Sequence, residues 1–588
     1  MRFRGDSGAP PAPARSGARI LLPAFTSALL LLLAQPPFRL VLLPFVALAP
    51  LAVALEWAAG GDTDMDALLA GVVFGVVHFG VLLFWIPVTL SPHFSWGIPA
   101  YGLLLLILAG LMGLVAWTAR RLRRGPGPFP ALPLPLAFAV AWVAMEWLRG
   151  HLPLGMAWPW MGLSLGLTPA PDLLGLAEWV GESGVAFWLA LMNGLVAQAL
   201  LRTSSARTWV LALLVFLGPA LLGTVRARSL ELEEGPNVAV VGTHVPRELK
   251  STPGAASREA LAQVREHLAP LTGAEGLPDS PHRTSPGSGD PPSAGLSPVA
   301  DVDLVVLPEA TVPLPLGSGR ADLFRDRLTD LARKLNGALI VGALDRKGEE
   351  QEGGAAASRP PLVNAAFLVT PRGPAAGPYH KMRLVPGMEA LPRFLPSVLS
   401  RGLFGPGSRS RLGSVAHPPT GEADVEREFF ARGDEARVVR WRGWSYGPLI
   451  CYESLFGGLA RRQTRNGADI LVNVTSDVWF GTPGEGLGAP GLRQHASHMV
   501  LRAVETRTPV ARAANGGFSF ILDPLGRTVG PEVGPGGGSV TAAVPLWPGE
   551  TLFARTGDLV GPAAVLLALG LLLGGAFVPG ARRTPSGE

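Results

Sequence analysis

Three polar residues that could support nucleophilic catalysis each lie beyond an apolar, strand-like run. Cys451 is the only cysteine in the chain and follows the run 444–450, Glu309 follows the run 304–307, and Lys381 lies in the segment 379–386. In α/β proteins, reactive groups collect in the loops at strand ends. A thiol needs a neighbouring base or cation to become a useful nucleophile. Glu309 could take the thiol proton, and Lys381 could stabilise the thiolate and then the oxyanion of a tetrahedral intermediate.

Each of these residues also has a structural interpretation without catalysis. A single cysteine commonly behaves as a small buried hydrophobe, a glutamate after a proline is commonly a solvated turn residue, and most lysines lie on the surface. Their common position at strand ends is what favours chemistry over packing.

The composition is typical of a membrane protein. Hydrophobic residues make up 48% of the chain and charged residues only 16%, whereas a soluble domain carries roughly 25% charged residues. The isoelectric point of about 9.8 could indicate a nucleic-acid-binding protein. The net charge is only +5, however, and no basic stripe with interleaved aromatic residues is present, so no nucleic-acid partner is expected.

Eight apolar runs are candidates for membrane-spanning helices. Most reach or approach the ~20 residues that a crossing requires. The first run follows several arginines, but no small-residue cleavage site follows it, so we interpret it as a retained helix rather than a signal peptide. The runs are 20–34, 40–57, 67–88, 98–117, 132–147, 185–201, 209–225 and 559–578.

The distribution of arginine predicts the orientation of these helices. The N-terminus, the loops after the fourth and sixth runs and the C-terminus all carry arginine, and basic short loops face the cytoplasm. With eight crossings, all four lie on the same side. We therefore expect a membrane domain at 1–226, an extracytoplasmic domain at 227–555, and an eighth crossing with a cytoplasmic tail at 556–588.

The large segment between the last two apolar runs has the pattern of an α/β domain. Strands are expected at 303–307, 338–341, 363–369, 444–450, 469–474, 510–513 and 518–522, and helices near 323–335 and 493–506. Two Pro-, Gly- or Ser-rich stretches, near 252–298 and 403–434, are expected to be surface insertions or mobile linkers.

Four segments of this domain resemble the nitrilase (carbon–nitrogen hydrolase) superfamily, and within it the apolipoprotein N-acyltransferase family. The soluble nitrilases share the Glu-Lys-Cys triad but lack the eight apolar runs. The resemblance therefore covers nearly the whole chain. The segments are 381–392 (KMRLVPGMEALP), 450–456 (ICYESLF), 473–481 (NVTSDVWFG) and 512–516 (RAANG).

This resemblance implies a fold: a polytopic α-helical membrane domain with eight transmembrane helices, joined to an extracytoplasmic nitrilase-like αββα sandwich. It also implies an enzyme of the bacterial inner membrane whose catalytic domain faces the periplasm. Its partners would be a phospholipid acyl donor and a diacylglyceryl apolipoprotein acceptor, and no cofactor or metal is expected.

The resemblance also assigns roles to residues of this chain. By position, Cys451 matches the nucleophile, Glu309 the general base and Lys381 the oxyanion partner. Glu389 matches a second essential acid, while Tyr452 and Glu453 match residues beside the nucleophile.

One position departs from the family pattern. Ser251 stands where many members have a tryptophan, which affects any contact with the acceptor or the acyl chain there. The acyl groove could come from the aromatic-rich segments 84–87, 93–96 and 156–160, although aromatic residues at span ends are commonly interface anchors.

Two other functions remain open at the level of sequence. A membrane-anchored amidase would use the same triad with water as the acceptor, and a non-enzymatic scaffold could retain a degenerate nitrilase domain. His495 and His498 have the i, i+3 spacing of helical zinc ligands, but the sequence offers no third ligand, so a zinc site is not expected.

Overall fold

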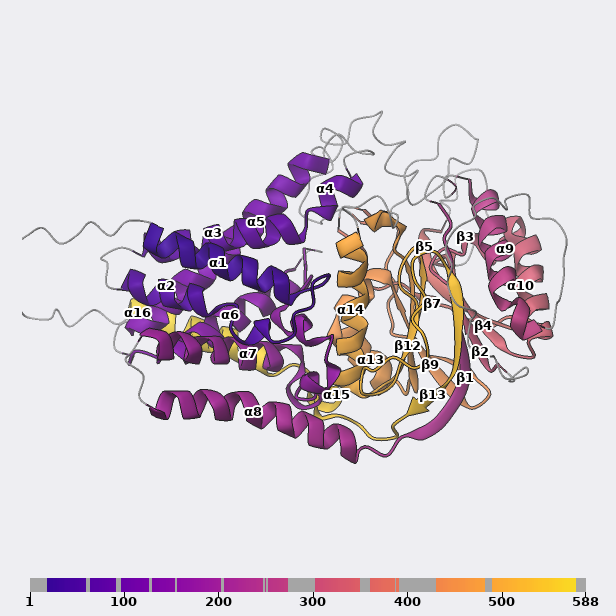
Figure 1. Ribbon diagram of the computed structural model, residues 1–588. Coiled ribbons are helices and arrows are strands. Elements are labelled where there is room, and N and C mark those ends of the chain that lie inside the picture. Colours follow the sequence, from indigo (N-terminus) through magenta and orange to yellow (C-terminus); the bar gives the residue numbers. More distant parts are fainter. Residues whose placement is uncertain are drawn as a thin grey trace, which may run out of the picture.

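The computed structural model consists of a bundle of apolar helices packed against an α/β sandwich (Figure 1). It describes residues 18–59, 64–90, 97–125, 129–153, 156–201, 206–246, 249, 252–272, 302–348, 360–386, 388–390, 430–481 and 489–577. Ser251 and the aromatic segment 93–96 lie outside the described residues.

The helical bundle contains a helix at each of the eight predicted apolar runs. Eight helices are α1 (Ala18–Ala34), α2 (Ala49–Ala59), α3 (Met65–Leu82), α5 (Gly97–Arg124), α6 (Leu134–His151), α7 (Ala177–Leu201), α8 (Ala206–Ser229) and α16 (Val560–Phe577), and the short α4 (Trp85–Leu90) follows α3.

Length and hydropathy support only part of the predicted crossing count. Among the described residues, four stretches are long and apolar enough to span a membrane: Met65–Thr89, Gly97–Arg124, Ala177–Leu201 and Ala206–Ser229. Three others, Arg19–Ala34, Leu43–Trp57 and Val560–Gly574, are shorter apolar helices. A membrane domain is thus supported, whereas eight crossings and their orientation stay predictions.

The sandwich contains two sheets. The first has the strand order β13-β1-β2-β4-β5-β6, with β3 beside β4 and β7 beside β5, and the second has the order β12-β11-β10-β9-β8. The first sheet comprises β1 (Glu233–Gly242), β2 (Leu304–Val306), β3 (Val312–Pro315), β4 (Ala338–Arg346), β5 (Leu362–Thr370), β6 (Gly373–Pro374), β7 (Tyr379–His380) and β13 (Gly538–Leu546). The second comprises β8 (Val439–Trp441), β9 (Trp444–Ile450), β10 (Ile470–Ser476), β11 (Val510–Asn515) and β12 (Phe520–Leu522).

Three apolar layers hold the sandwich together. Side chains of both sheets, among them Val306, Ile340 and Val472, form the central layer. The outer face of the first sheet packs against α9 (Pro253–Thr272) and α10 (Asp322–Lys334), and that of the second against α13 (Gly457–Arg465) and α14 (Ala489–Thr506). This is the expected αββα arrangement, in which strands buried on both faces are continuous apolar runs.

The strands and helices predicted from the sequence are present, and the fold also contains elements that were not predicted. All seven expected strands and both expected helices occur, with ends shifted by a few residues. Part of the Pro/Ser/Gly-rich stretch 252–298 differs from the expected linker, because 253–272 form α9. Leu261, Val264 and Leu268 are buried on one side of that helix, so the helical spacing of apolar residues outweighed the local composition. Residues 273–298 and 403–429 lie outside the described part of the chain.

The helical bundle contacts the face of the sandwich that α14 covers (Figure 1). The largest apolar cluster contains bundle residues together with Tyr452, Leu455 and Phe480 of the sandwich. The turn that follows β9 is therefore packed between the two parts of the molecule.

Candidate active site

Cys451 lies at the carboxyl end of β9, where the strand turns into a short 3₁₀ helix, η6 (Cys451–Leu455). Its φ of +51° is in the left-handed region that residues other than glycine rarely adopt. Such a conformation costs about 1–3 kcal/mol, so the surrounding structure must hold it. The thiol forms no disulfide and is half-buried. The positive φ places Cys451 on a strained strand-to-helix turn.

Glu309 follows β2 and is held by three hydrogen-bond donors. One carboxylate oxygen accepts from Lys381 at 3.1 Å and from Asn364 at 2.6 Å, and the other accepts from the backbone N–H of Ser476 at 2.9 Å. A Cβ at Gly342 would lie 2.5 Å from the Cα of Glu309, so only glycine lets the loop pass this close to β4.

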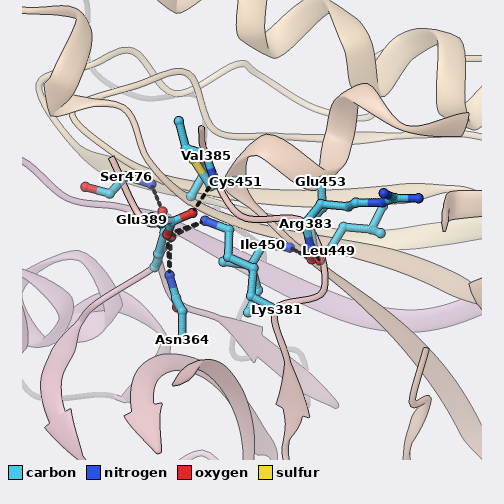
Figure 2. Close-up of polar contacts among 12 residues, drawn as sticks. Asn364, Lys381, Arg383, Val385, Glu389, Leu449, Ile450, Cys451, Glu453 and Ser476 are labelled. Atoms are coloured by element: carbon cyan, nitrogen blue, oxygen red, sulfur yellow. Dashed lines mark hydrogen bonds and ion pairs between the residues drawn. The ribbon is translucent and has the colours of Figure 1, made fainter. Parts of the chain in front are cut away.

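Lys381 joins the two predicted carboxylates. Its ammonium lies 3.1 Å from Glu309 and 2.8 Å from Glu389, and only 1% of its side chain is exposed. The second oxygen of Glu389 accepts from the backbone N–H of Val385 at 2.8 Å. Figure 2 shows Lys381 beside Glu389, with Cys451 nearby. The structure thus brings the three predicted catalytic residues together with Glu389.

Burial, together with the carboxylates of this cluster, raises the pKa of the Cys451 thiol and keeps it protonated at rest. Burial lowers the pKa of Lys381, but Glu309 and Glu389 outweigh burial and hold that pKa well above its usual value. Burial, and then Glu309, raise the pKa of the Cys451 thiol, while Lys381 lowers it in part. A neutral thiol beside a carboxylate requires proton transfer before or during attack, which is the chemistry of an activated cysteine.

Glu453 connects the nucleophile turn to the Lys381 loop. One oxygen of this fully buried carboxylate accepts from the backbone N–H groups of Met382 and Arg383, and the other accepts from Ile450 N–H and from the Tyr379 hydroxyl. Four donors satisfy the buried carboxylate, as its burial requires. Glu453 therefore fixes the position of Cys451 relative to Lys381.

Tyr452 connects the same turn to the helical bundle. Its hydroxyl donates to the carbonyl oxygen of Ala157 at 2.7 Å, and its ring packs near Trp158 and Phe456. Ala157 and Trp158 belong to the predicted aromatic segment 156–160, which lies beside the site rather than at a free surface.

Asn364 was not predicted. Its amide donates to Glu309 at 2.6 Å and to Glu389 at 3.3 Å, so it contacts both carboxylates. A buried asparagine in the apolar run 362–370 was the available signal, since a polar side chain facing a core must find a partner.

A second unpredicted network lies behind the nucleophile. His495 contacts Asp477 at 2.9 Å and the carbonyl oxygen of Cys451 at 3.2 Å. Arg512 lies 2.6 Å from the other oxygen of Asp477. Although burial raises the pKa of Asp477, Arg512 and His495 lower it to about 2. Asp477 and Arg512 lie in the motifs quoted above, but no partner for either could be inferred from the sequence.

The two histidines of α14 are not part of a metal-binding group among the described residues. His495 is bonded as described, and among the described residues no group of three or more His, Cys, Asp or Glu side chains could hold a metal ion.

Two family models match the chain. The model described as the apolipoprotein N-acyltransferase N-terminal domain matches residues 27–195, and the carbon-nitrogen hydrolase model matches residues 297–546. The α/β sandwich is therefore a carbon–nitrogen hydrolase domain.

Curated relatives match over nearly the full length. The apolipoprotein N-acyltransferase of Geobacter metallireducens is 29% identical over 570 residues, which is 94% of this chain and 95% of the relative. That of Azotobacter vinelandii is 30% identical, with 86% of this chain and 85% of the relative covered. Among solved structures, Saccharomyces cerevisiae Nit3 is 16% identical with a TM-score of 0.33, covering 54% of this chain and 92% of Nit3.

Proposed function

The chain belongs to the apolipoprotein N-acyltransferase family, and from this membership and the geometry of the site we propose that it acylates the N-terminal amine of diacylglyceryl-cysteine lipoproteins. The acyl group comes from a phospholipid and passes through a thioester on Cys451. The observation that carries this proposal is the grouping of buried Glu309 and Lys381 with Cys451, which lies on a turn that also contacts the helical bundle.

In the first half-reaction, Glu309 takes the proton of the Cys451 thiol while the sulfur attacks the carbonyl carbon of the phospholipid ester. Lys381 stabilises the oxyanion of the tetrahedral intermediate. The intermediate collapses by breaking its bond to the glycerol oxygen, and protonated Glu309 returns the proton to that oxygen. The products are a thioester and a lysophospholipid.

In the second half-reaction, the α-amine of the lipoprotein cysteine attacks the thioester carbonyl. Glu309 accepts the proton that the amine loses, the carbon–sulfur bond breaks, and Glu309 passes that proton to the leaving thiolate. The product carries an amide at its N-terminus and the enzyme returns to its starting state. Both substrates are anchored in a bilayer, which suits a nucleophile turn packed against apolar helices.

The proposed setting is the bacterial inner membrane, with the catalytic domain in the periplasm. In this proposal 1–226 and 556–588 form the eight-helix membrane part, and 227–555 form the catalytic domain. The arginine bias of the loops supports this orientation.

The decisive experiment follows both halves with mass spectrometry. The purified protein is incubated with phospholipid vesicles alone, and we expect a mass gain on Cys451 that neutral hydroxylamine removes. A diacylglyceryl-cysteine peptide should then lose the adduct and gain an amide-linked acyl chain. Release of free fatty acid with the peptide unmodified would instead establish an amidase-like hydrolase that uses water. Absence of any adduct under conditions where transfer occurs would eliminate the covalent route.

A further inference from the structure

His495 lies directly behind the nucleophile turn, and no role in the reaction described above depends on it. It comes from α14, is 1% exposed, and uses both ring nitrogens. Nδ1 lies 2.9 Å from a carboxylate oxygen of Asp477, and Nε2 lies 3.2 Å from the carbonyl oxygen of Cys451 and 3.1 Å from the hydroxyl of Ser454.

The Asp477 side of the ring fixes a proton on Nδ1. Asp477 is fully buried and pairs with Arg512 at 2.6 Å. It also accepts from the hydroxyl of Thr475 at 2.9 Å. An ionised carboxylate only accepts hydrogen bonds, so the His495 nitrogen that faces it must donate. Arg512 also approaches the same nitrogen, at 3.4 Å.

The Cys451 side of the ring fixes a second donor. A peptide carbonyl oxygen only accepts, so a contact of 3.2 Å with Nε2 is favourable only if Nε2 carries a proton. We propose that His495 is a positioning residue for the nucleophile: its ring is held by Asp477, and it donates Nε2–H to the Cys451 carbonyl so as to hold the strained turn. This inference rests on the proposed function, because it assigns His495 to the acylation of Cys451.

The strain at Cys451 explains why such a residue is needed. The left-handed φ of +51° is unfavourable for cysteine and persists only where neighbouring groups fix it. Glu453 holds the amide of Ile450, just before the nucleophile, at 2.7 Å. His495 holds the carbonyl of Cys451, just after the side chain that reacts. The two contacts fix the Leu449–Ile450 peptide before the nucleophile and the Cys451–Tyr452 peptide directly after it.

The helical bundle closes the far side of the imidazole. The Trp160 ring stacks on His495 with centroids 5.8 Å apart and an interplanar angle of 19°. The Trp160 indole N–H donates to Gln494, the residue before His495, at 2.9 Å. The ring of His495 is thus held between a carboxylate of the sandwich and an aromatic residue of the membrane part.

Two amide substitutions separate the two contacts of His495. In His495→Gln the terminal amide reaches the place of Nε2 and can donate to the Cys451 carbonyl. In His495→Asn the amide reaches only the place of Nδ1 and can contact Asp477 alone. The burst of p-nitrophenol from a p-nitrophenyl ester measures acylation of Cys451, and vesicles of phosphatidylethanolamine measure it with a lipid donor. The maximal rate and the half-saturating concentration are recorded separately.

We expect His495→Asn to lower the maximal acylation rate about 10- to 100-fold, because a buried carbonyl loses its donor and the turn loses its support. His495→Gln should keep most of the rate, and the half-saturating concentration should not change in either variant. Ser454→Ala, which removes the other neighbour of Nε2, should leave the rate within about twofold of wild type.

Three outcomes would overturn the proposal. They are equal losses in the Gln and Asn variants, a change confined to the half-saturating concentration, and a large loss in Ser454→Ala, which would show Nε2 to be an acceptor from the hydroxyl. If the Asn variant does not fold, the rates of the Gln and Ser454→Ala variants still test the proposal. An ester burst with no lipid adduct on the wild type would count against the phospholipid donor and leave the role of His495 intact.

Discussion

Replacing Glu309 with glutamine should change catalysis and thiol reactivity in opposite directions. The carboxylate receives three hydrogen bonds, two on one oxygen and one on the other. Glutamine has a single acceptor oxygen, so at least one of these donors must face an NH₂ group and lose its partner. Loss of a general base typically lowers the rate by about 10²–10⁴, or roughly 3–5 kcal/mol at 1.36 kcal/mol per factor of ten. We expect thioester formation to fall by at least this much.

The same substitution should make the thiol easier to ionise. After burial, Glu309 is the largest cause that raises the pKa of Cys451, and Lys381 remains to lower it. The thiolate is the form that reacts with iodoacetamide, so removal of the carboxylate enriches it at a given pH. Alkylation of Cys451 at pH 7.5 should therefore be faster in Glu309→Gln than in the wild type, while acylation is slower.

Both rates can be measured on one preparation, because Cys451 is the only thiol in the chain. Iodoacetamide labelling is followed by mass spectrometry, and acylation by single-turnover adduct formation with phospholipid. Glu435→Gln is the control, since Glu435 is an exposed partner of Arg437; it should change neither rate. Robust thioester formation by Glu309→Gln would refute the assignment of the base, and slower alkylation would refute the electrostatic argument.

Two further predictions use the same assays, and a third tests the orientation. Lys381→Met should slow alkylation of Cys451 at every pH, because a cation that lowers the thiol pKa is lost. In the wild type, the raised thiol pKa should make the alkylation rate increase with pH to above pH 9 without a plateau. A plateau near pH 7 would contradict this expectation. Glu389→Gln should retain part of the thioester formation while transfer to the acceptor is lost, because Glu389 also holds the Lys381 loop through Val385; equal losses in both half-reactions would argue against this division. In a Cys451→Ser background, Arg320→Cys on the sandwich surface should react with a membrane-impermeant maleimide from the periplasmic side, and labelling only after lysis would overturn the orientation.

The grouping of the three candidate catalytic residues could be predicted in part because each lies in a recognisable local pattern. Apolar runs of four to seven residues predicted the strands, and the polar residue beyond each run predicted the site. Glu309, Lys381 and Cys451 were found in this way, without knowledge of which strands are neighbours. In the fold, Glu309 follows β2 and Lys381 follows β7 of the first sheet, whereas Cys451 follows β9 of the second, so packing of the two sheets brings these strand ends together.

Asn364 and the network around His495 could not be predicted, because their contacts join residues far apart in the sequence. Asn364 meets Glu309 across 55 positions, and His495 meets the Cys451 carbonyl across 44. Sequence spacing within α14 linked His495 to His498, whereas packing linked it to Asp477 instead. The edge strand β13 and its neighbour β1 were also missed, since each has exposed or half-buried positions that weaken its apolar pattern.

The contact between the nucleophile turn and the helical bundle leads to a last prediction, on Tyr452. Its ring is buried, and its hydroxyl donates to the Ala157 carbonyl at 2.7 Å. Tyr452→Phe keeps the ring packing near Trp158 but removes this bond, which contributes about 0.5–1.5 kcal/mol net and more if the carbonyl stays unpaired.

If the bond aligns the site with the membrane part, acylation by phospholipid in vesicles should slow about tenfold in Tyr452→Phe. Acylation by a p-nitrophenyl ester and alkylation by iodoacetamide should stay near wild-type rates, since neither small reagent requires that alignment. Thr556→Val, which removes an exposed hydroxyl at the end of α15 (Leu552–Thr556), is the matched control and should affect none of the three rates. A uniform loss across all three reagents in Tyr452→Phe would mean that the hydroxyl supports the turn itself. An unchanged rate with vesicles would mean that packing around Trp158 and Phe456 alone joins the two parts at the site.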